Sequence, residues 1–320
     1  MNLVSRLFGG RKSERVELHA TPKQAGGWGD PYPTRKLPEV GEVVRAIEPQ
    51  VADVQRILRE RDQLRQQLKH ATAKVEFTPG RDFVCVLPFC AADEHRFRQL
   101  LGWIAELGRV DATAVIVAPA SVHIDSLTSL SLRAFTNPAF IHTPFDLPKE
   151  GWPTGTCWSF LKAAEHCRRN NLDFWLNEPD CIPLKPGWFE AIRAEYRACG
   201  KPYMGFIEPG TGDYPRHLTG NAAYHHSVFH HFRADKLGVA WDIAMADVLT
   251  PLAHPTRLFH QEFGPLDHPP VFHTVDDLRR IPQEAMVFHR NKDGSLIRVL
   301  REQREMEQRT SEDAKQEVGA

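Results

Sequence analysis

Two carboxylates on either side of a proline are the residues best suited to chemistry. Glu178 and Asp180 flank Pro179 and come directly after Leu172–Leu176, which we expect to be a buried strand. Ligands of open α/β sheets bind at the carboxyl ends of such strands. Carboxylate oxygens on a stiff turn suit Mg²⁺ or Mn²⁺, which can bridge two phosphates and stabilise a leaving diphosphate. The alternative is a solvated acidic turn, or an anchor for the helix that begins near Pro186.

A late histidine is the second candidate metal ligand. His289 ends the apolar segment Met286-Val287-Phe288, and the turn Lys292-Asp293-Gly294 follows it. Neutral imidazole is a good ligand for manganese. A structural or surface role for this histidine is the alternative interpretation.

Three further residues of the second half could contact a substrate. Gly220 and Asn221 stand before an expected helix, where glycine permits close approach and asparagine offers sugar hydroxyls a donor and an acceptor. Asp242 follows Trp241 and is our candidate base, with Asp247 as the second choice. The alternative for Asp242 is a helix N-cap, because an apolar helical segment follows it.

Histidines also gather between the candidate glycine and the candidate base. His226 and His230 are four residues apart and could bind zinc on one face of a helix. The chain has no HExxH motif and no carboxylate at ligand spacing beside them. A solvated helix face is therefore the favoured interpretation of these histidines.

Alternating apolar segments must position these residues. Strand-like runs alternate with amphipathic helical segments, which predicts an α/β fold with a mostly parallel central sheet flanked by helices. The expected strands are 83–88, 112–118, 139–142, 172–176 and 286–289. The expected helices are 92–108, 155–170, one opening at Gly187-Trp188-Phe189, and a closing helix over 296–307.

The N-terminal part has a different character. Residues 1–40 are rich in glycine, proline and charge, which predicts a flexible arm. Residues 41–75 have apolar residues at helical spacing, which fits a coiled coil that joins copies of the chain equally with a helix packed on its own domain. We expect the main domain over 80–305 and a polar, frayed tail over 306–320.

Composition excludes few classes of protein. The formal net charge is -1, so no global attraction to nucleic acid or an anionic membrane is expected. The six cysteines form no CxxC pair and are expected to be small buried residues in a reducing cytosol. No apolar run approaches the ~20 residues of a membrane span. Residues 1–11 lack a signal-peptide pattern, so we predict a cytoplasmic protein.

The stretch WLNEPDCIPLKPGW resembles the acidic metal-binding turn of GT-A-type glycosyltransferases, usually written DxD, with glutamate at its first position. The resemblance covers roughly residues 81–300 and implies a metal held by Asp180 and His289. It also implies that Lys292 lies near the diphosphate and that Glu178 faces the ribose or a metal-bound water. Pro88 and Phe89, with Cys90 beside them, would contact the base and ribose. Asp242 would deprotonate the acceptor in an inverting enzyme.

The function that this resemblance implies is transfer of a sugar from a nucleoside diphosphate sugar to an acceptor hydroxyl. The metal would be Mn²⁺ or Mg²⁺, and the acceptor a glycan, a protein or a modified nucleic acid. Neither GxGxxG nor GxxxxGK[ST] is present, so dinucleotide and P-loop sites are not expected. The alternatives are a nucleotidyltransferase-like enzyme and a catalytically degenerate scaffold assembled through residues 41–75.

Overall fold

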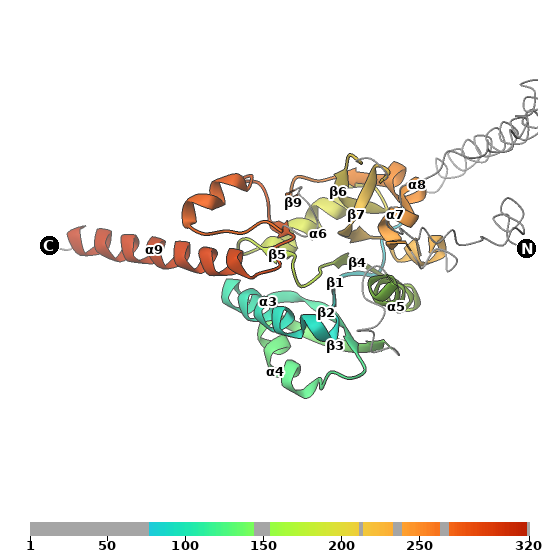
Figure 1. Cartoon of the computed structure of the whole chain (residues 1–320), viewed down its shortest axis with the longest axis horizontal. Helices are drawn as coiled ribbons and strands as arrows, with labels where there is room; N and C mark the ends of the chain where they lie inside the picture. Colours follow the sequence, from blue (N-terminus) through green and yellow to red (C-terminus); the bar gives the residue numbers. More distant parts are fainter. Residues whose placement is uncertain (1–76, 144–153, 211–213, 233–238, 263–268, 319–320) are drawn as a thin grey trace, which may run out of the picture. The chain divides into compact units, whose positions relative to one another are not determined.

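The structure is a computed structural model that describes residues 77–143, 154–210, 214–232, 239–262 and 269–318 (Figure 1). The chain divides into two units, Met1–Val75 and Glu76–Ala320. The described residues all belong to the second unit. The expected arm over 1–40 and the expected helix over 41–75 lie outside them.

A seven-stranded sheet forms the centre of the second unit, in the order β3-β2-β1-β4-β7-β6-β8. Its strands are β1 (Asp82–Pro88), β2 (Val110–Pro119), β3 (Phe135–Thr143), β4 (Leu172–Leu176), β6 (Tyr203–Glu208), β7 (His217–Tyr224) and β8 (Ala253–Pro255). Pairing is parallel from β3 through to β4 and between β6 and β8, whereas β7 is antiparallel to both of its neighbours. The predicted α/β class with a mostly parallel sheet is confirmed.

A smaller sheet pairs a strand from the C-terminal part of the chain with a strand from the middle of the sequence. It has the order β5-β10-β9 and contains β5 (Ile182–Pro183), β9 (Phe259–Gln261) and β10 (Val287–His289). The strand expected over 286–289 is therefore present, but it belongs to this sheet. Because β10 is antiparallel to β5, His289 lies beside the segment that carries Glu178 and Asp180.

Helices cover both faces of the main sheet. They are α3 (Glu94–Leu107), α4 (Asp125–Ala134), α5 (Thr154–Asn170), α6 (Trp188–Cys199), α7 (Trp241–Ala244), α8 (Ala246–Leu249) and α9 (Ser295–Val318). Short 3-10 turns are η1 (Ala91–Asp93), η2 (His226–His231), η4 (Thr250–Leu252) and η5 (Val275–Arg280). The helix α6 begins after Gly187 and ends before Gly200, and both glycines have positive φ.

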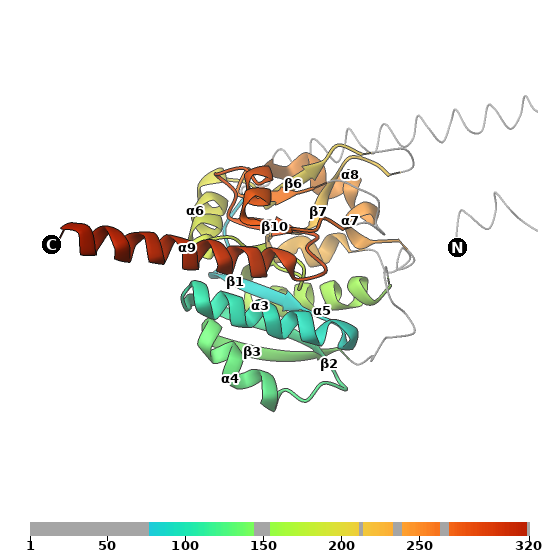
Figure 2. The ribbon, with the colours of Figure 1, turned by 60° about the vertical axis from the view of Figure 1, so that its left-hand side comes forward.

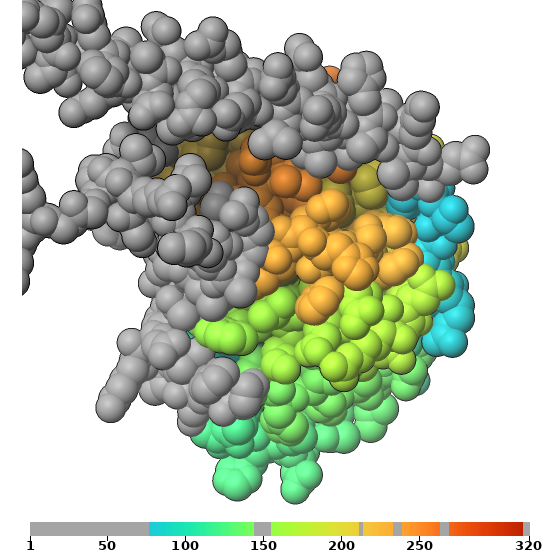
Figure 3. Space-filling model, turned by 90° about the vertical axis from the view of Figure 1, so that its right-hand side faces the viewer, coloured from blue at the N-terminus to red at the C-terminus, as the bar shows by residue number. Residues whose placement is uncertain are grey.

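Alternate residues of β1 enter two different cores. Phe83, Cys85 and Leu87 pack with residues of α3, α4, α6 and α9, whereas Val84 and Val86 pack with residues of α5 and α7. Successive strand side chains point to opposite faces, so a run of apolar residues must be covered on both sides. Figure 2 shows α9 and α3 on one face, and Figure 3 shows α5 beside residues of η2 and α7 on the other.

Three expectations about elements need correction. Gly220 and Asn221 stand inside β7, not before a helix, because this segment pairs with β4 and β6. The closing helix expected over 296–307 runs from Ser295 to Val318, so the predicted frayed tail from Thr310 is helical as far as the description reaches. Charged pairs one turn apart, such as Arg298 with Glu302 and Arg309 with Glu305, support this polar helix. Its second half projects from the sheet (Figure 1).

Two expectations about composition can be compared with the structure. Cys85, Cys157, Cys167 and Cys181 are buried free thiols, as expected, while Cys90 is exposed. No described helix combines the length and apolar character needed to cross a lipid bilayer.

A buried carboxylate connects the beginning of the domain to its centre. Asp173 in β4 is 2% exposed, and its oxygens accept the backbone N–H of Gly80 at 2.7 Å and that of His226 at 3.0 Å. A Cβ at Gly80 would lie 2.8 Å from the Asp173 carboxylate, so only glycine fits there. Asp173 therefore positions both Gly80 and the start of η2.

We predict that Asp173→Asn lowers the free energy of unfolding by about 2–4 kcal/mol, because an amide N–H would face donors that need an acceptor. Denaturant unfolding at pH 7 measures this loss. Asp82→Asn is the matched control, because Asp82 is exposed at the start of β1. Equal stability of the two variants would contradict the role given to Asp173.

Candidate active site

The acidic turn is held rigidly at the end of β4. The carbonyl of Glu178 accepts the N–H of Cys181 at 2.9 Å, which closes a turn with Pro179 at its second position. Before it, the buried Asn177 donates its backbone N–H to Val86 O at 2.9 Å and its side-chain amide to Cys181 O at 2.8 Å. The turn is thus fixed to β1 and to its own far end.

Asn221 positions the first carboxylate of the turn. Its Oδ1 accepts the Glu178 backbone N–H at 2.7 Å, and its Nδ2 donates to Glu178 Oε2 at 3.0 Å. Asn221 is fully buried in β7. Its side chain was expected to contact sugar hydroxyls, but both ends of the amide are engaged with Glu178.

His289 completes the group from the other end of the chain. Its Nε2 lies 3.3 Å from Asp180 Oδ1 and 3.6 Å from Glu178 Oε2. Its Nδ1 lies 2.8 Å from Gln261 Oε1 in β9. Because an amide oxygen can only accept, the Nδ1 carries the proton, and Nε2 is directed at the two carboxylates.

Residues after His289 connect the loop between β10 and α9 to the acidic turn. The Asn291 backbone N–H donates to Asp180 O at 3.2 Å. The buried Asn291 side chain donates to Asp293 Oδ1 and accepts the N–H of Leu296 in the first turn of α9. The beginning of α9 therefore fixes the loop that carries His289 and Lys292.

Opposite charges control ionisation within the group. Burial alone would lower the pKa of His289, but Asp180 and Glu178 outweigh it and raise the pKa to about 9. Burial would raise the pKa of Asp180, but His289 and Lys292 outweigh it and hold the pKa below its usual value. In the absence of other ligands, a protonated imidazole therefore offsets part of the negative charge of the group at neutral pH.

A divalent cation fits this group of residues. One donor atom from each of Glu178, Asp180 and His289 lies within 4.8 Å of the others. Two carboxylates with one imidazole suit Mn²⁺ or Mg²⁺. The side chains are 28%, 14% and 15% exposed, so the group is open to a ligand on one side.

Gly220 brings Asp242 close to the acidic turn. A Cβ at Gly220 would lie 3.3 Å from the Trp241 ring and 3.5 Å from Asp242 Oδ2. Trp241 begins α7 and stacks on Phe160 of α5 with ring centroids 3.7 Å apart. Burial raises the pKa of Asp242, His217 opposes this, and Glu178 adds to it, with a net rise. Asp242 thus belongs to the same edge of the sheet as Glu178.

The remaining predicted residues have different surroundings. The ring of Phe89 is in the core, stacked on Phe97 with centroids 4.2 Å apart, and its N–H donates to Val117 O. Pro88 ends β1 and is buried. Lys292 is exposed near Asp180, and Asp247 is exposed on α8.

A second group could also hold a metal, at the opposite end of β4. It consists of Asp173, His225 and His226. No carboxylate stands at ligand spacing beside His226 and His230 in the sequence, whereas folding brings Asp173 of β4 to His225 and His226. His225 Nε2 lies 3.0 Å from Thr78 O, and His226 Nδ1 lies 3.0 Å from Asp173 Oδ1. These groups are already hydrogen bonded to the protein.

Sequence reasoning missed the residues that support the ligands. Asn177 adjoins the acidic turn and could have been suspected from that position alone. Gln261 and His217 carry no motif, although His217 directly precedes the segment that contains Gly220 and Asn221.

Comparison with known proteins gives structural likeness only. No family model and no curated protein matches the sequence. Mouse xyloside xylosyltransferase 1 in its apo form is similar with a TM-score of 0.42 and 11% identity, over 66% of this chain and 98% of that one. S. aureus TarS 1-349 in complex with UDP is similar with a TM-score of 0.38 and 13% identity, over 55% of this chain and 57% of that one. A 4-diphosphocytidyl-2C-methyl-D-erythritol synthase from Anaerococcus prevotii is similar with a TM-score of 0.38 and 7% identity, over 55% of this chain and 87% of that one.

Similar structures therefore include GT-A-type glycosyltransferases, the family that the acidic turn resembles. A likeness at these TM-scores does not identify a substrate or a reaction.

Protons and metal should compete for His289. Because its pKa is about 9 in the metal-free protein, a cation must displace a proton at neutral pH. We predict that apparent Mn²⁺ affinity rises about tenfold per unit between pH 6 and pH 8. Calorimetry in two buffers of different ionisation enthalpy measures both the affinity and the proton released. In His289→Gln, whose amide does not titrate, the dependence should flatten; a wild-type affinity that is independent of pH would contradict this assignment.

Proposed function

We propose that this protein is a metal-dependent glycosyltransferase that moves a sugar from a nucleoside diphosphate sugar to an acceptor hydroxyl. The observation that carries the proposal is the convergence of Glu178, Asp180 and His289 at the carboxyl end of β4. Ligands of α/β sheets bind at this edge. A cation bound there supplies positive charge to a leaving diphosphate.

Each residue has a distinct part in the proposal. Asp180 and His289 hold the cation, and Glu178, fixed by Asn221, completes the group or contacts a metal-bound water. Lys292 is exposed beside Asp180, where it would attract the diphosphate.

Pro88 and Phe89 are proposed to line the base site through their backbone only, because the Phe89 ring is in the core. Gly220 leaves room for the sugar beside Asp242.

Asp242 is the proposed base for an inverting reaction. Its Oδ2 lies 3.5 Å from the position that a Cβ would take at Gly220, and Glu178 raises the pKa of Asp242. A buried carboxylate with a raised pKa is suited to accept a proton near neutral pH. The acceptor class stays open among a glycan, a protein and a modified nucleic acid. A cytoplasmic location and assembly through residues 41–75 also stay predictions.

Binding tests this function most directly. We predict that UDP or GDP with Mn²⁺ raises the melting temperature of the wild-type protein and that Asp180→Asn abolishes the rise, because a cation ligand is lost. Asp125→Asn is the matched control, since Asp125 is exposed in the first turn of α4. Absence of any shift in the wild type with either nucleotide would overturn the proposal.

Labelled substrates separate the proposal from its rivals. Transfer or hydrolysis of a labelled sugar from its nucleoside diphosphate is the expected result. Release of pyrophosphate from a nucleoside triphosphate would indicate a nucleotidyltransferase instead. A protein that binds neither class of substrate would fit the scaffold alternative.

A further inference from the structure

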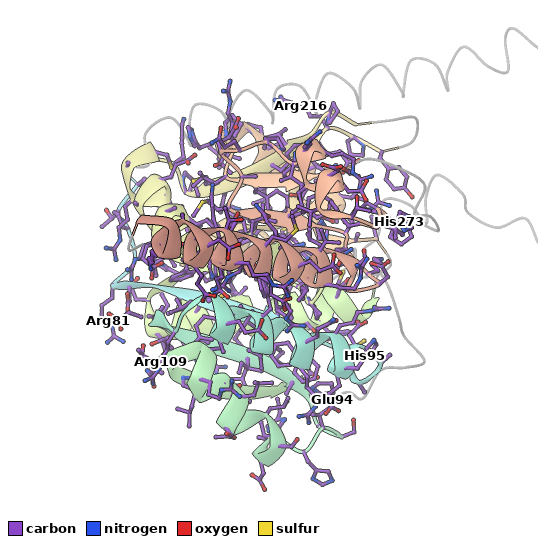
Figure 4. The ribbon with its side chains drawn as sticks, turned by 90° about the vertical axis from the view of Figure 1, so that its left-hand side faces the viewer. Arg81, Glu94, His95, Arg109, Arg216 and His273 are labelled. Atoms are coloured by element: carbon purple, nitrogen blue, oxygen red, sulfur yellow. The ribbon has the colours of Figure 1, made fainter. Side chains whose placement is uncertain are left out.

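A second group of ionisable residues lies beside the cation ligands. Glu208 ends β6, His217 begins β7 and is its direct partner in the ladder, and Asp242 is in the first turn of α7. In Figure 4, Arg216, which directly precedes His217, lies at the top of the view. Because β7 is antiparallel to both β4 and β6, the start of β7 lies at the edge at which β4 and β6 end. The group therefore belongs to the edge of the sheet at which β1 and β4 end.

The orientation of His217 is fixed by a backbone carbonyl. Its Nδ1 lies 2.8 Å from Pro215 O, and a carbonyl oxygen can only accept, so Nδ1 carries a proton. Its Nε2 then faces both acids, at 3.7 Å from Glu208 Oε2 and 4.0 Å from Asp242 Oδ2. The imidazole side chain is 7% exposed, so these charges interact with little screening by water.

The two oxygens of Asp242 have different roles. Oδ1 accepts the backbone N–H of Ile243 at 2.9 Å. Oδ2 faces His217 and the position that Gly220 leaves free. The separation of 4.0 Å from Nε2 is too long for a direct hydrogen bond, but one oxygen atom could bridge the two groups. An acceptor hydroxyl is such an oxygen.

We propose that Glu208, His217 and Asp242 form the acceptor subsite, in which His217 is a positioning residue that faces Asp242 Oδ2, and Oδ2 accepts the proton of an acceptor hydroxyl. This inference rests on the proposed transferase function and specifies its acceptor side. The acceptor O–H bond breaks and its proton goes to Asp242 Oδ2. The oxygen bonds to the anomeric carbon as the carbon–oxygen bond to the diphosphate breaks and its electron pair leaves with the diphosphate.

A charge opposite Asp242 is needed because its surroundings disfavour the carboxylate. Burial is the largest effect that raises the pKa of Asp242, Glu178 raises it further, and His217 lowers it. A carboxylic acid that stays protonated cannot act as a base. Glu208 is the second carboxylate that faces the His217 ring, with Oε2 at 3.7 Å from Nε2. The other titratable groups that interact with His217 or Asp242 are Glu178 after β4, Tyr224 on β7, Cys157 on α5 and Glu208 on β6.

The decisive measurement follows the Asp242 carboxyl group itself. In His217→Asn the shorter amide can still donate to Pro215 O but lacks the nitrogen that faces the acids. We predict that the ¹³C-carboxyl titration midpoint of Asp242 in the metal-free full chain rises by about one pH unit, or tenfold in proton affinity. Near-ultraviolet circular dichroism checks the fold, and His217→Gln, which is also uncharged, should move the midpoint in the same direction.

A second histidine–carboxylate pair provides the control. His254 on β8 lies 3.4 Å from Glu195 of α6, so His254→Asn removes a similar pair and should leave the Asp242 midpoint unchanged. An unchanged midpoint in both folded His217 variants would overturn the inference. A shift of equal size in His254→Asn would also overturn it, because the effect would then be general.

Kinetics separates this inference from the proposed function. In His217→Asn, the midpoint of the acidic limb in the pH profile of kcat/KM should rise together with the titration midpoint of Asp242. Mn²⁺-dependent binding of UDP or GDP should stay as in wild type. If the wild-type chain binds no nucleotide, the transferase function fails, yet the carboxyl titration still tests the His217–Asp242 pair. If nucleotide binds and the limb does not move, only the role of His217 fails.

Discussion

The pairing of β5 with β10 is the contact on which the candidate active site depends. The strand β5 directly follows the acidic turn, and β10 ends at His289, so their antiparallel ladder places the imidazole beside Asp180. The hydrogen bond from Asn291 to Asp180 continues this connection beyond the strands. Without this small sheet, the main sheet would present two carboxylates and no third ligand.

Charge compensation is the second constraint at this edge of the sheet. Carboxylates that are partly removed from water are costly unless donors or cations accompany them. Glu178 has Asn221, Asp180 has His289, and Asp242 has His217. Each acid is therefore paired with a residue from another part of the chain, and the chemistry of the edge depends on correct packing of β7 and β10.

Much of the fold could be predicted from local pattern. The segments of β1, β2 and β4 are continuous buried runs, and α3 and α5 have clear helical periods, so their types and approximate bounds follow from hydrophobic spacing. The β7 segment could not be predicted in the same way, because Gly220 and Asn221 resemble a turn unless β4 and β6 are present to pair with it. The charged end of α9 likewise predicts a frayed tail, because it lacks an apolar pattern and is supported only by charged pairs one turn apart.

Local sequence alone predicts the acidic turn, its place after a buried strand, and the two late residues His289 and Lys292. These follow from neighbouring residues, because a strand followed by a proline turn is specified by adjacent positions. Two contacts appear only in the folded chain: Asn221 hydrogen bonds to Glu178, and His217 faces Asp242. Such contacts join residues far apart in the chain, so no local pattern records them, and their distances exist only once both strands have paired.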